Sequence, residues 1–134
     1  MAEGGIVFLF DENSPHRLVR SLRELGEAAF HVYDVGLKQA PDEMVLRYAG
    51  QRGWCIVSSD RNILHRPHER AVLSEFSIGA FFLKDTIAGT CKIARTIYRH
   101  WPEMKRIAGT EAKPFLYLVR ETTLTRIWRK KLGE

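Results

Sequence analysis

Residues 5–16 read GIVFLFDENSPH, and this stretch decides the fold. Its first six residues are apolar and rich in strand formers, which is typical of a short strand buried on both faces of a sheet. Asp11 follows the strand, and Ser14 with Pro15 predicts a helix start in which Ser14 is the cap. The stretch also sets two acids, Asp11 and Glu12, side by side where one capping residue would be enough. It therefore predicts a strand–helix unit and raises the question of what the acids bind.

The rest of the chain repeats this alternation. Leu18, Leu22 and Leu25 recur at helical spacing until Gly26, and they predict one buried helix face. Further helices are predicted from Ala40 to Gly53, from about Pro67 to Glu75 and over residues 86–100, after which Pro102 is expected to start a new turn. Further strands are predicted over residues 28–34, 54–59, 76–83, 114–119 and 123–128.

Strands that alternate with helices predict an α/β fold, a single-domain three-layer α/β/α sandwich whose central sheet is mostly parallel. With 134 residues, of which 45% are hydrophobic, the chain is long enough for one domain with a real core. We expect residues 1–134 to form this domain, with the chemical motifs in residues 6–83 and a helix and strand extension over residues 86–128.

The composition excludes some classes of protein. The chain has no uncharged apolar stretch of 18 residues and does not begin like a signal peptide, so we expect a soluble, cytoplasmic protein without a membrane partner. Its two cysteines, Cys55 and Cys91, have neither metal-site spacing nor the density of a disulfide scaffold, and both are predicted to be buried.

Charge is divided unevenly along the chain. Residues 1–83 carry 9 basic and 11 acidic residues, whereas residues 84–134 carry 12 basic and 5 acidic ones. This asymmetry favours an acidic centre in the first part and a basic surface in the second that could attract a polyanion. Ordinary solvated helix faces would give the same counts.

Three acids that are distant in sequence are predicted to meet at one edge of the sheet. Asp11 and Asp60 each come directly after a strand, and ligands of parallel sheets bind at the carboxyl ends of the strands. Asp42 lies at the start of a helix and shares the face of Val45 and Leu46, whereas Glu43 is rotated away from that face. Glu43 stays in reserve because helix starts vary by a residue or two.

Carboxylates gathered in a cleft repel one another unless a cation offsets their charge, so a divalent ion is the simplest occupant. Mg²⁺ and Mn²⁺ take oxygen ligands, and Asn13 or Asn62 could supply an amide oxygen or hold a bound water. Zinc fits less well because no cysteine or histidine pair has convincing spacing. Each acid alone is also explained by a turn or a helix cap.

The chain resembles the PIN-like nuclease domains, in particular the compact group related to VapC-type toxins. The resemblance lies in FLFDENSPHRLVRSLRELG, GLKQAPDEMVLRYAGQRGWCIVSSDRN and ERAVLSEFSIGAFFL, which run in order over roughly residues 6–83. It implies a metal-dependent ribonuclease in which acids at strand ends bind Mg²⁺ or Mn²⁺ and a metal-activated water attacks a phosphodiester. It also implies an antitoxin protein as a partner, and such proteins often form homodimers.

The resemblance assigns the family's motif acids to Asp11, Asp42 and Asp60, with Asn13 at the polar position after the first acid. Relatives often carry a further acid where this chain has Asn62, so the site has fewer carboxylates. In the resulting hypothesis Asp11 and Asp60 hold the ion, with Glu12 and Asn62 in reserve as ligands. Asp42, or Glu43 in its place, orients or deprotonates the attacking water.

Basic residues on the predicted loops of the same edge are candidates for contacts with RNA phosphates. They are Arg61, Arg66 and Lys84, and the basic helix from Lys92 to Arg99 would extend the track.

Two other functions remain open from the sequence. A phosphoacceptor signalling domain also has an acid pair after its first strand, an aspartate after the third and a lysine after a later one. Asp60 and Lys84 resemble this aspartate and this lysine. That fold needs one more strand between the two residues than the spacing here allows. An inactive nucleic-acid-binding or interaction module is the other alternative, and Asn62 is the observation that favours it.

Overall fold

The computed structural model describes residues 6–59 and 67–129 of the chain. Within these ranges the elements follow in the order β1 (Phe8–Phe10), α1 (His16–Glu24), β2 (Ala29–His31), the short 3-10 helix η2 (Val32–Val35), α2 (Asp42–Arg52), β3 (Cys55–Ser58), α3 (Pro67–Glu75), β4 (Gly79–Leu83), α4 (Thr90–Thr110), β5 (Phe115–Val119) and β6 (Leu124–Arg129). None of the helices in this described part is long and apolar enough to cross a membrane.

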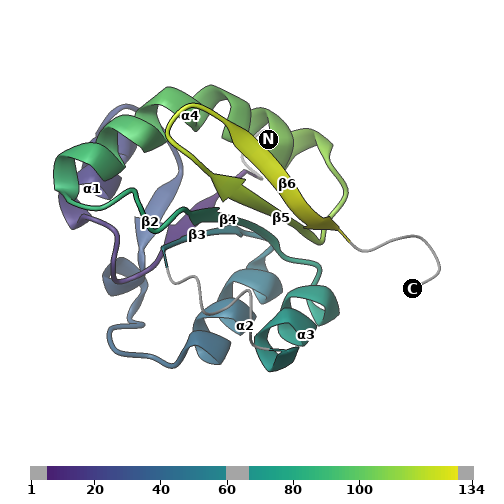
Figure 1. The fold of residues 1–134 in the computed structure, drawn as a ribbon. Coiled ribbons are helices and arrows are strands. Elements are labelled where there is room, and N and C mark those ends of the chain that lie inside the picture. The colour runs from purple at the N-terminus through teal and green to yellow at the C-terminus, as the bar shows by residue number, and fades with distance from the viewer. Residues whose placement is uncertain (1–5, 60–66, 130–134) are drawn as a thin grey trace.

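The strands form one six-stranded sheet in the order β2-β1-β3-β4-β5-β6 (Figure 1). All pairings from β2 to β5 are parallel, and only the last pairing, between β5 and β6, is antiparallel. Helices α1 and α4 cover one face of the sheet, and α2 and α3 cover the other (Figure 1). The predicted three-layer α/β/α sandwich with a mostly parallel sheet is confirmed.

Strand β1 contributes side chains to the hydrophobic cores on both faces of the sheet, as its apolar sequence predicts. Phe8, Leu9 and Phe10 are all fully buried. Because side chains alternate across a strand, Phe8 and Phe10 pack into the core beneath α1 and α4, whereas Leu9 packs into the core beneath α2 and α3. The ring of Trp101 of α4 packs at a tilt against Phe8, with 4.6 Å between the ring centroids. Burial on both faces explains why this short strand can be entirely apolar.

Most of the apolar face predicted for helix α1 is buried. Leu18, Val19 and Leu22 are buried, but the prediction for Leu25 is wrong, since that side chain is 68% exposed. Leu25 is already the residue that caps the helix, and Gly26 follows with a φ of 93° that a residue with a side chain rarely adopts. The chain therefore turns away before the third leucine reaches the sheet.

Helix α4 runs past the proline that was expected to interrupt it. Pro102 lies inside the helix, although it has no N–H to donate to the carbonyl group of Tyr98. Trp101, Met104 and Ile107 on either side of Pro102 are buried against the sheet. Packing of this apolar face outweighs the loss of one hydrogen bond, so the predicted helix end is wrong.

The two cysteines differ from each other. Cys55 in β3 is buried as predicted, and burial raises the pKa of its thiol to about 11. Cys91 is exposed, so its predicted burial is wrong. Helix α4 begins only at Thr90, and its buried face runs through Ile93 and Ile97 instead.

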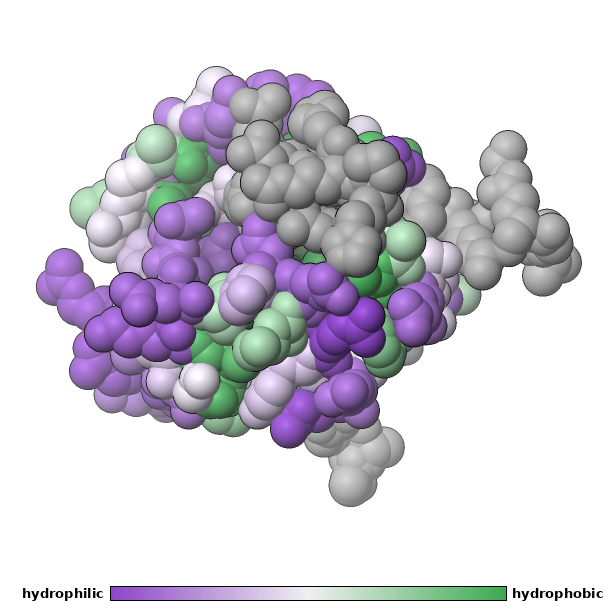
Figure 2. All heavy atoms as spheres, turned by 90° about the horizontal axis from the view of Figure 1, so that it is seen from below, coloured by the Kyte–Doolittle hydropathy of each residue, from purple (hydrophilic) through white to green (hydrophobic). Residues whose placement is uncertain are grey.

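Helices α2 and α3 approach each other closely. Gly50 lies inside α2, and a Cβ atom there would be 2.4 Å from the Cβ of Phe76, so a larger residue would push the helix outward. The face of the molecule that carries these helices is largely hydrophilic, with smaller apolar patches between the polar side chains (Figure 2). The apolar residues of α2 and α3 thus mostly point inward.

The sheet order sets the place of the site. Strand β1 has β2 on one side and β3 on the other, so the chain builds the sheet in opposite directions from β1. Loops that leave the carboxyl ends of two such strands separate and leave a crevice between them, which is where ligands of open α/β sheets bind.

Candidate functional site

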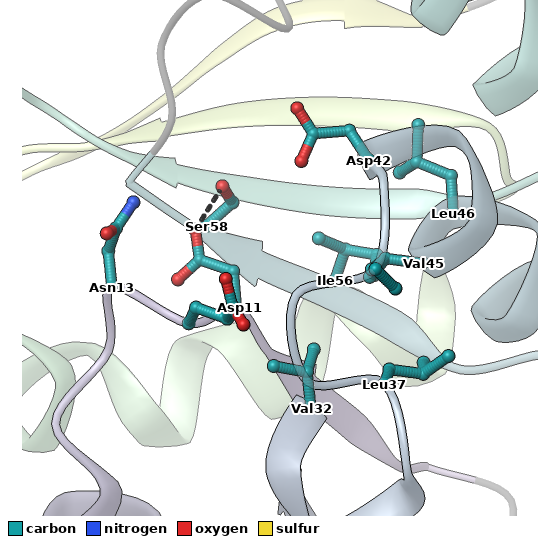
Figure 3. Close-up of a pocket in the computed structure, with 11 residues that line it drawn as sticks. Asp11, Asn13, Val32, Leu37, Asp42, Val45, Leu46, Ile56 and Ser58 are labelled. Carbon is teal, nitrogen blue, oxygen red and sulfur yellow. Dashed lines mark hydrogen bonds between the residues drawn. The ribbon is translucent and has the colours of Figure 1, made fainter.

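A cavity of about 90 Å³ lies at the carboxyl ends of β1 and β3, closed on its far side by the start of α2. Its polar lining consists of Asp11, Glu12, Asn13, Asp42 and Ser58, and its apolar wall includes Val32, Leu37, Leu46 and Ile56. We call it the acidic cavity. Figure 3 shows Asp11, Asn13 and Ser58 on one side and Asp42 across from them at the start of α2. Two of the three predicted acids therefore share one cavity.

Asp11 is held by donors from two segments of the chain. Its Oδ2 accepts hydrogen bonds from the hydroxyl group of Ser58 at 2.6 Å and from the backbone N–H of Ser59 at 3.1 Å. Its Oδ1 accepts one from the hydroxyl group of Ser14 at 3.1 Å. The backbone N–H of Asp11 donates to the carbonyl group of Val57, which continues the pairing of β1 with β3. The carboxylate is thus fixed in orientation.

Burial and these hydrogen bonds act in opposite directions on Asp11. Burial raises the pKa of the carboxyl group, and the bonds from Ser58, Ser59 and Ser14 offset only part of that rise, so the pKa stays above its usual value. A raised pKa means that the protein stabilises the negative charge less well than water does. A cation placed beside the carboxylate would supply the missing stabilisation.

Ser14 has a different role from the one predicted. Pro15 stands at the N-cap of α1, no side chain caps that helix, and the Ser14 hydroxyl group is bonded to Asp11 instead. The backbone carbonyl group of Ser14 accepts a hydrogen bond of 3.0 Å from Nε2 of His31. His31 is buried, and its Nδ1 accepts from the backbone N–H of Tyr33, which leaves the proton on Nε2.

His31 therefore supports the acidic cavity from behind. Burial lowers the pKa of His31, so the ring stays neutral at pH 7 and keeps its single proton for Ser14. Asp34 fixes the other side of this segment by accepting from the backbone N–H of His31 at 2.8 Å and from Arg23 at 2.8 Å.

The two acids at the start of α2 point in different directions. Asp42 lines the acidic cavity together with Val45 and Leu46, as the helical spacing predicts. Glu43 forms an ion pair with Arg47, at 2.9 Å between its Oε2 and Nη2 of Arg47, and does not line this cavity. The structure thus places Asp42, and not Glu43, in the lining of the acidic cavity.

Glu12, the second acid of the opening stretch, is joined to the loop that leads into α2. Its carboxylate accepts a short hydrogen bond from the backbone N–H of Gln39. Gln39 has a φ of 61°, which is uncommon for a residue with a side chain, so this contact helps to hold a strained turn. Glu12 thereby connects the end of β1 to the segment that carries Asp42, while its role as a reserve metal ligand stays a prediction.

Several predicted site residues lie outside the described residues, namely Asp60, Arg61, Asn62 and Arg66. Lys84 follows β4 at the same sheet edge, and its Nζ is 3.9 Å from the carboxylate of Asp85. It is not among the residues that line the acidic cavity. Asn13 does line the cavity, as expected.

The donor set matches a hard divalent cation in its chemistry. Asp11, Asp42, Asn13 and Ser58 all offer oxygen atoms to one cavity. In the described part of the chain, however, no group of three or more histidine, cysteine, aspartate or glutamate side chains is arranged to hold a metal ion. The third predicted acid, Asp60, falls outside that part.

The comparison with protein families bears on this geometry. A family model described as a PIN-like domain matches residues 6–85, which include β1 to β4 and the whole acidic cavity. The chain belongs to the PIN-like domain family. No curated protein and no solved structure matches it. PIN-like domains are commonly nucleases, and the match supports a possible nuclease function for this member.

Ser58 and His31 were missed as parts of the site. No motif around Ser58 in the sequence points to a supporting role for its hydroxyl group. The strand register makes Asp11 and Ser58 neighbours, because each directly follows one member of the pair Phe10 and Val57, but this register cannot be read from either strand alone. For His31 no signal in the sequence pointed toward Ser14.

Proposed function

We propose that the protein is a metal-dependent ribonuclease that hydrolyses RNA phosphodiesters, with Asp11 and Asp42 as ligands of Mg²⁺ or Mn²⁺ and Asp60 as a third. The observation that carries this proposal is the meeting of Asp11 and Asp42 in one cavity at the switch point of a PIN-like fold. Their separate origins, from the end of β1 and the start of α2, argue against a chance pair of turn residues.

The support for Asp11 as the main ligand comes from its fixed orientation. Ser58 and Ser59 both donate to Oδ2, whereas Ser14 donates to Oδ1 at 3.1 Å, and Oδ1 is the oxygen that we expect to face the cation. A bound divalent cation would lower the pKa of a water molecule and offset the charge that develops on the phosphate.

Asp42 lies across the acidic cavity from Asp11 and reaches it from a different layer of the fold (Figure 3). We propose that it orients the attacking water or accepts its proton. Asn13, beside Asp11, is suited to hold the same water through its amide oxygen. No covalent intermediate with the protein is needed for this hydrolysis.

The test is cleavage of a fluorophore–quencher-labelled single-stranded RNA by the purified chain with Mn²⁺. We expect cleavage by the wild-type protein, its loss in EDTA, and its loss in Asp11→Asn with the circular dichroism spectrum unchanged. If neither protein cleaves RNA, the inactive interaction module becomes the better account.

The order of the strands in the sheet argues against a phosphoacceptor signalling domain. Lys84 follows β4, which lies directly beside β3, and within residues 6–59 and 67–129 no further strand separates β3 from β4. Incubation with acetyl phosphate would still detect it, since a stable acyl phosphate on Asp60 would overturn the nuclease proposal.

A toxin of the VapC type is the finer form of the proposal, with an antitoxin protein as a partner and a possible homodimer. It is tested by expression in bacteria. Growth arrest that Asp11→Asn relieves is the expected result, and unaffected growth would leave a nuclease without toxin function.

A further inference from the structure

A second hollow, of about 140 Å³, lies between α4 and the turn that joins β5 to β6. It is lined by Lys92, Arg95, Thr96, Arg99 and Glu121, and we call it the basic hollow. Figure 1 shows this turn beside the first half of α4. Three cations and a single carboxylate thus surround one depression.

The three cations share one face of the helix. Residues three and four apart lie above one another on an α-helix, so Lys92, Arg95 and Arg99 form one row of positive charge over two turns. Their charge exceeds that of Glu121 by two units. A row of this kind matches the spacing of an extended polyanion better than that of a single small anion.

Glu121 contacts two of the cations. Its carboxylate lies 2.7 Å from Nζ of Lys92, and its backbone carbonyl group accepts a hydrogen bond of 2.9 Å from Arg99. The next residue back, Arg120, offers its carbonyl group to Nε2 of His100 at 2.7 Å. The turn is therefore fastened to α4 at three points, and the cations are partly ordered before any ligand arrives.

The basic hollow faces the same edge of the sheet as the acidic cavity. Helix α4 begins after the carboxyl end of β4, and the turn begins after the carboxyl end of β5. The acidic cavity lies at the carboxyl ends of β1 and β3, and Lys84 follows the carboxyl end of β4, the strand between β3 and β5. A nucleic-acid strand that lies along this edge could contact both.

Building on the proposed nuclease function, we propose that the basic hollow binds backbone phosphates of the RNA strand other than the phosphate that is cleaved. The guanidinium groups of Arg95 and Arg99 are suited to two-pronged contacts with phosphate oxygens, and Lys92 supplies a point charge. An acidic protein segment would be attracted by the same charges, but the shared edge with the acidic cavity favours the strand that is cleaved there.

The test is the binding of a fluorescein-labelled 20-nucleotide oligouridylate, measured by fluorescence anisotropy in EDTA so that no cleavage occurs. Arg95→Glu is compared with Arg106→Glu, which makes the same charge change on the same helix. Arg106 lies 11 residues further along, about 16 Å by the helical rise, and pairs with Glu103.

We expect Arg95→Glu to weaken binding by about tenfold or more and to reduce the dependence of log Kd on log salt by about 0.7, the value for one phosphate contact on a single strand. Arg106→Glu should weaken binding by less than about twofold. Glu121→Gln, which removes the opposing charge, should strengthen binding.

Equal losses in Arg95→Glu and Arg106→Glu would overturn the proposal, because net charge alone would then explain binding. The proposal would also be overturned if labelled poly-L-glutamate bound as tightly as the RNA and lost as much affinity in Arg95→Glu. The cleavage assay keeps the two proposals apart. Binding that depends on Arg95 in a protein that cleaves nothing supports the basic hollow and rejects the nuclease, whereas cleavage with unchanged binding in Arg95→Glu rejects the basic hollow.

Discussion

In the acidic cavity Asp11 accepts hydrogen bonds from Ser14, Ser58 and Ser59 on two segments of the chain, whereas in the basic hollow the cations extend from one helix and Glu121 contacts two of them. The acid is fixed by short side chains and backbone, and the cations are exposed or half-buried on long side chains. Chemistry at a bond needs fixed positions, but attraction of a strand needs only charge in the right region. We therefore expect single substitutions to act strongly in the cavity and moderately in the hollow.

The largest effect should come from Asp42 when it is compared with its neighbour. We predict that Asp42→Asn lowers the rate of Mn²⁺-dependent RNA cleavage by at least about 100-fold, a typical loss for a group that stabilises the reacting centre. Glu43→Gln, which alters a carboxylate paired with Arg47, should lower it by less than about threefold. Initial rates measure both, and the reverse ranking would move the site to Glu43.

A smaller effect should come from Ser58, which holds Asp11 without belonging to the proposed ligands. Ser58→Ala removes the 2.6 Å hydrogen bond to Oδ2, and we predict a loss in Mn²⁺ affinity of about 10-fold, the lower end for groups that orient metal ligands. Isothermal titration calorimetry measures this affinity. Ser21→Ala is the matched control, because Ser21 donates to the carbonyl group of Leu18 on α1. Equal affinity in both variants would show that Asp11 does not need Ser58.

In the basic hollow the effects should be moderate and additive. We predict that Lys92→Ala and Arg95→Ala each weaken RNA binding by about threefold and that the double variant weakens it by about their product. Two cations that contact separate phosphates act independently. Anisotropy titrations at one salt concentration provide the values, and a double variant no weaker than either single one would mean that both residues serve one contact.

The smallest effect should come from Asp34, which holds the segment behind the acidic cavity. Burial acts to raise the pKa of Asp34, but hydrogen bonds from His31, Arg23 and His16 outweigh it and lower that pKa to about 2. A carboxyl group with a lowered pKa stabilises the fold above its usual pKa of about 3.8, and this stability is lost as the pH falls toward 2.

Asp34→Asn should therefore cost about 1 kcal/mol of unfolding free energy at pH 7, after allowance for the screening of a partly exposed group. The difference from the wild-type protein should shrink between pH 4 and pH 2. Urea unfolding at several pH values measures it, and a difference that stays constant down to pH 2 would contradict the role given to the charge of Asp34.

Most of the fold could be predicted because its signals are local. The apolar run before Asp11 shows a strand buried on both faces, and Gly26 and Gly53 mark helix ends where φ is positive. The errors arose where packing overrides a local preference. Pro102 normally ends a helix, but the apolar residues around it are held by the sheet, and that contact is invisible in the sequence.

The acids of the site could be predicted in part for a similar reason. The place of Asp11 follows from the end of a strand, and that of Asp42 follows from helical spacing. The partners of Asp11 could not be predicted, because Ser14 looks like a helix cap and the position of Ser58 depends on the register between β1 and β3. Register is set by the whole sheet rather than by either strand.

The most direct test of this account is the binding of Mn²⁺ to the RNA-free protein, measured by electron paramagnetic resonance for the wild-type chain, Asp11→Asn and Asp42→Asn. We predict that the wild-type protein binds Mn²⁺ and that each variant binds it at least about tenfold more weakly while keeping the wild-type circular dichroism spectrum. Unchanged Mn²⁺ affinity in both folded variants would contradict the claim that these two carboxylates form one metal site.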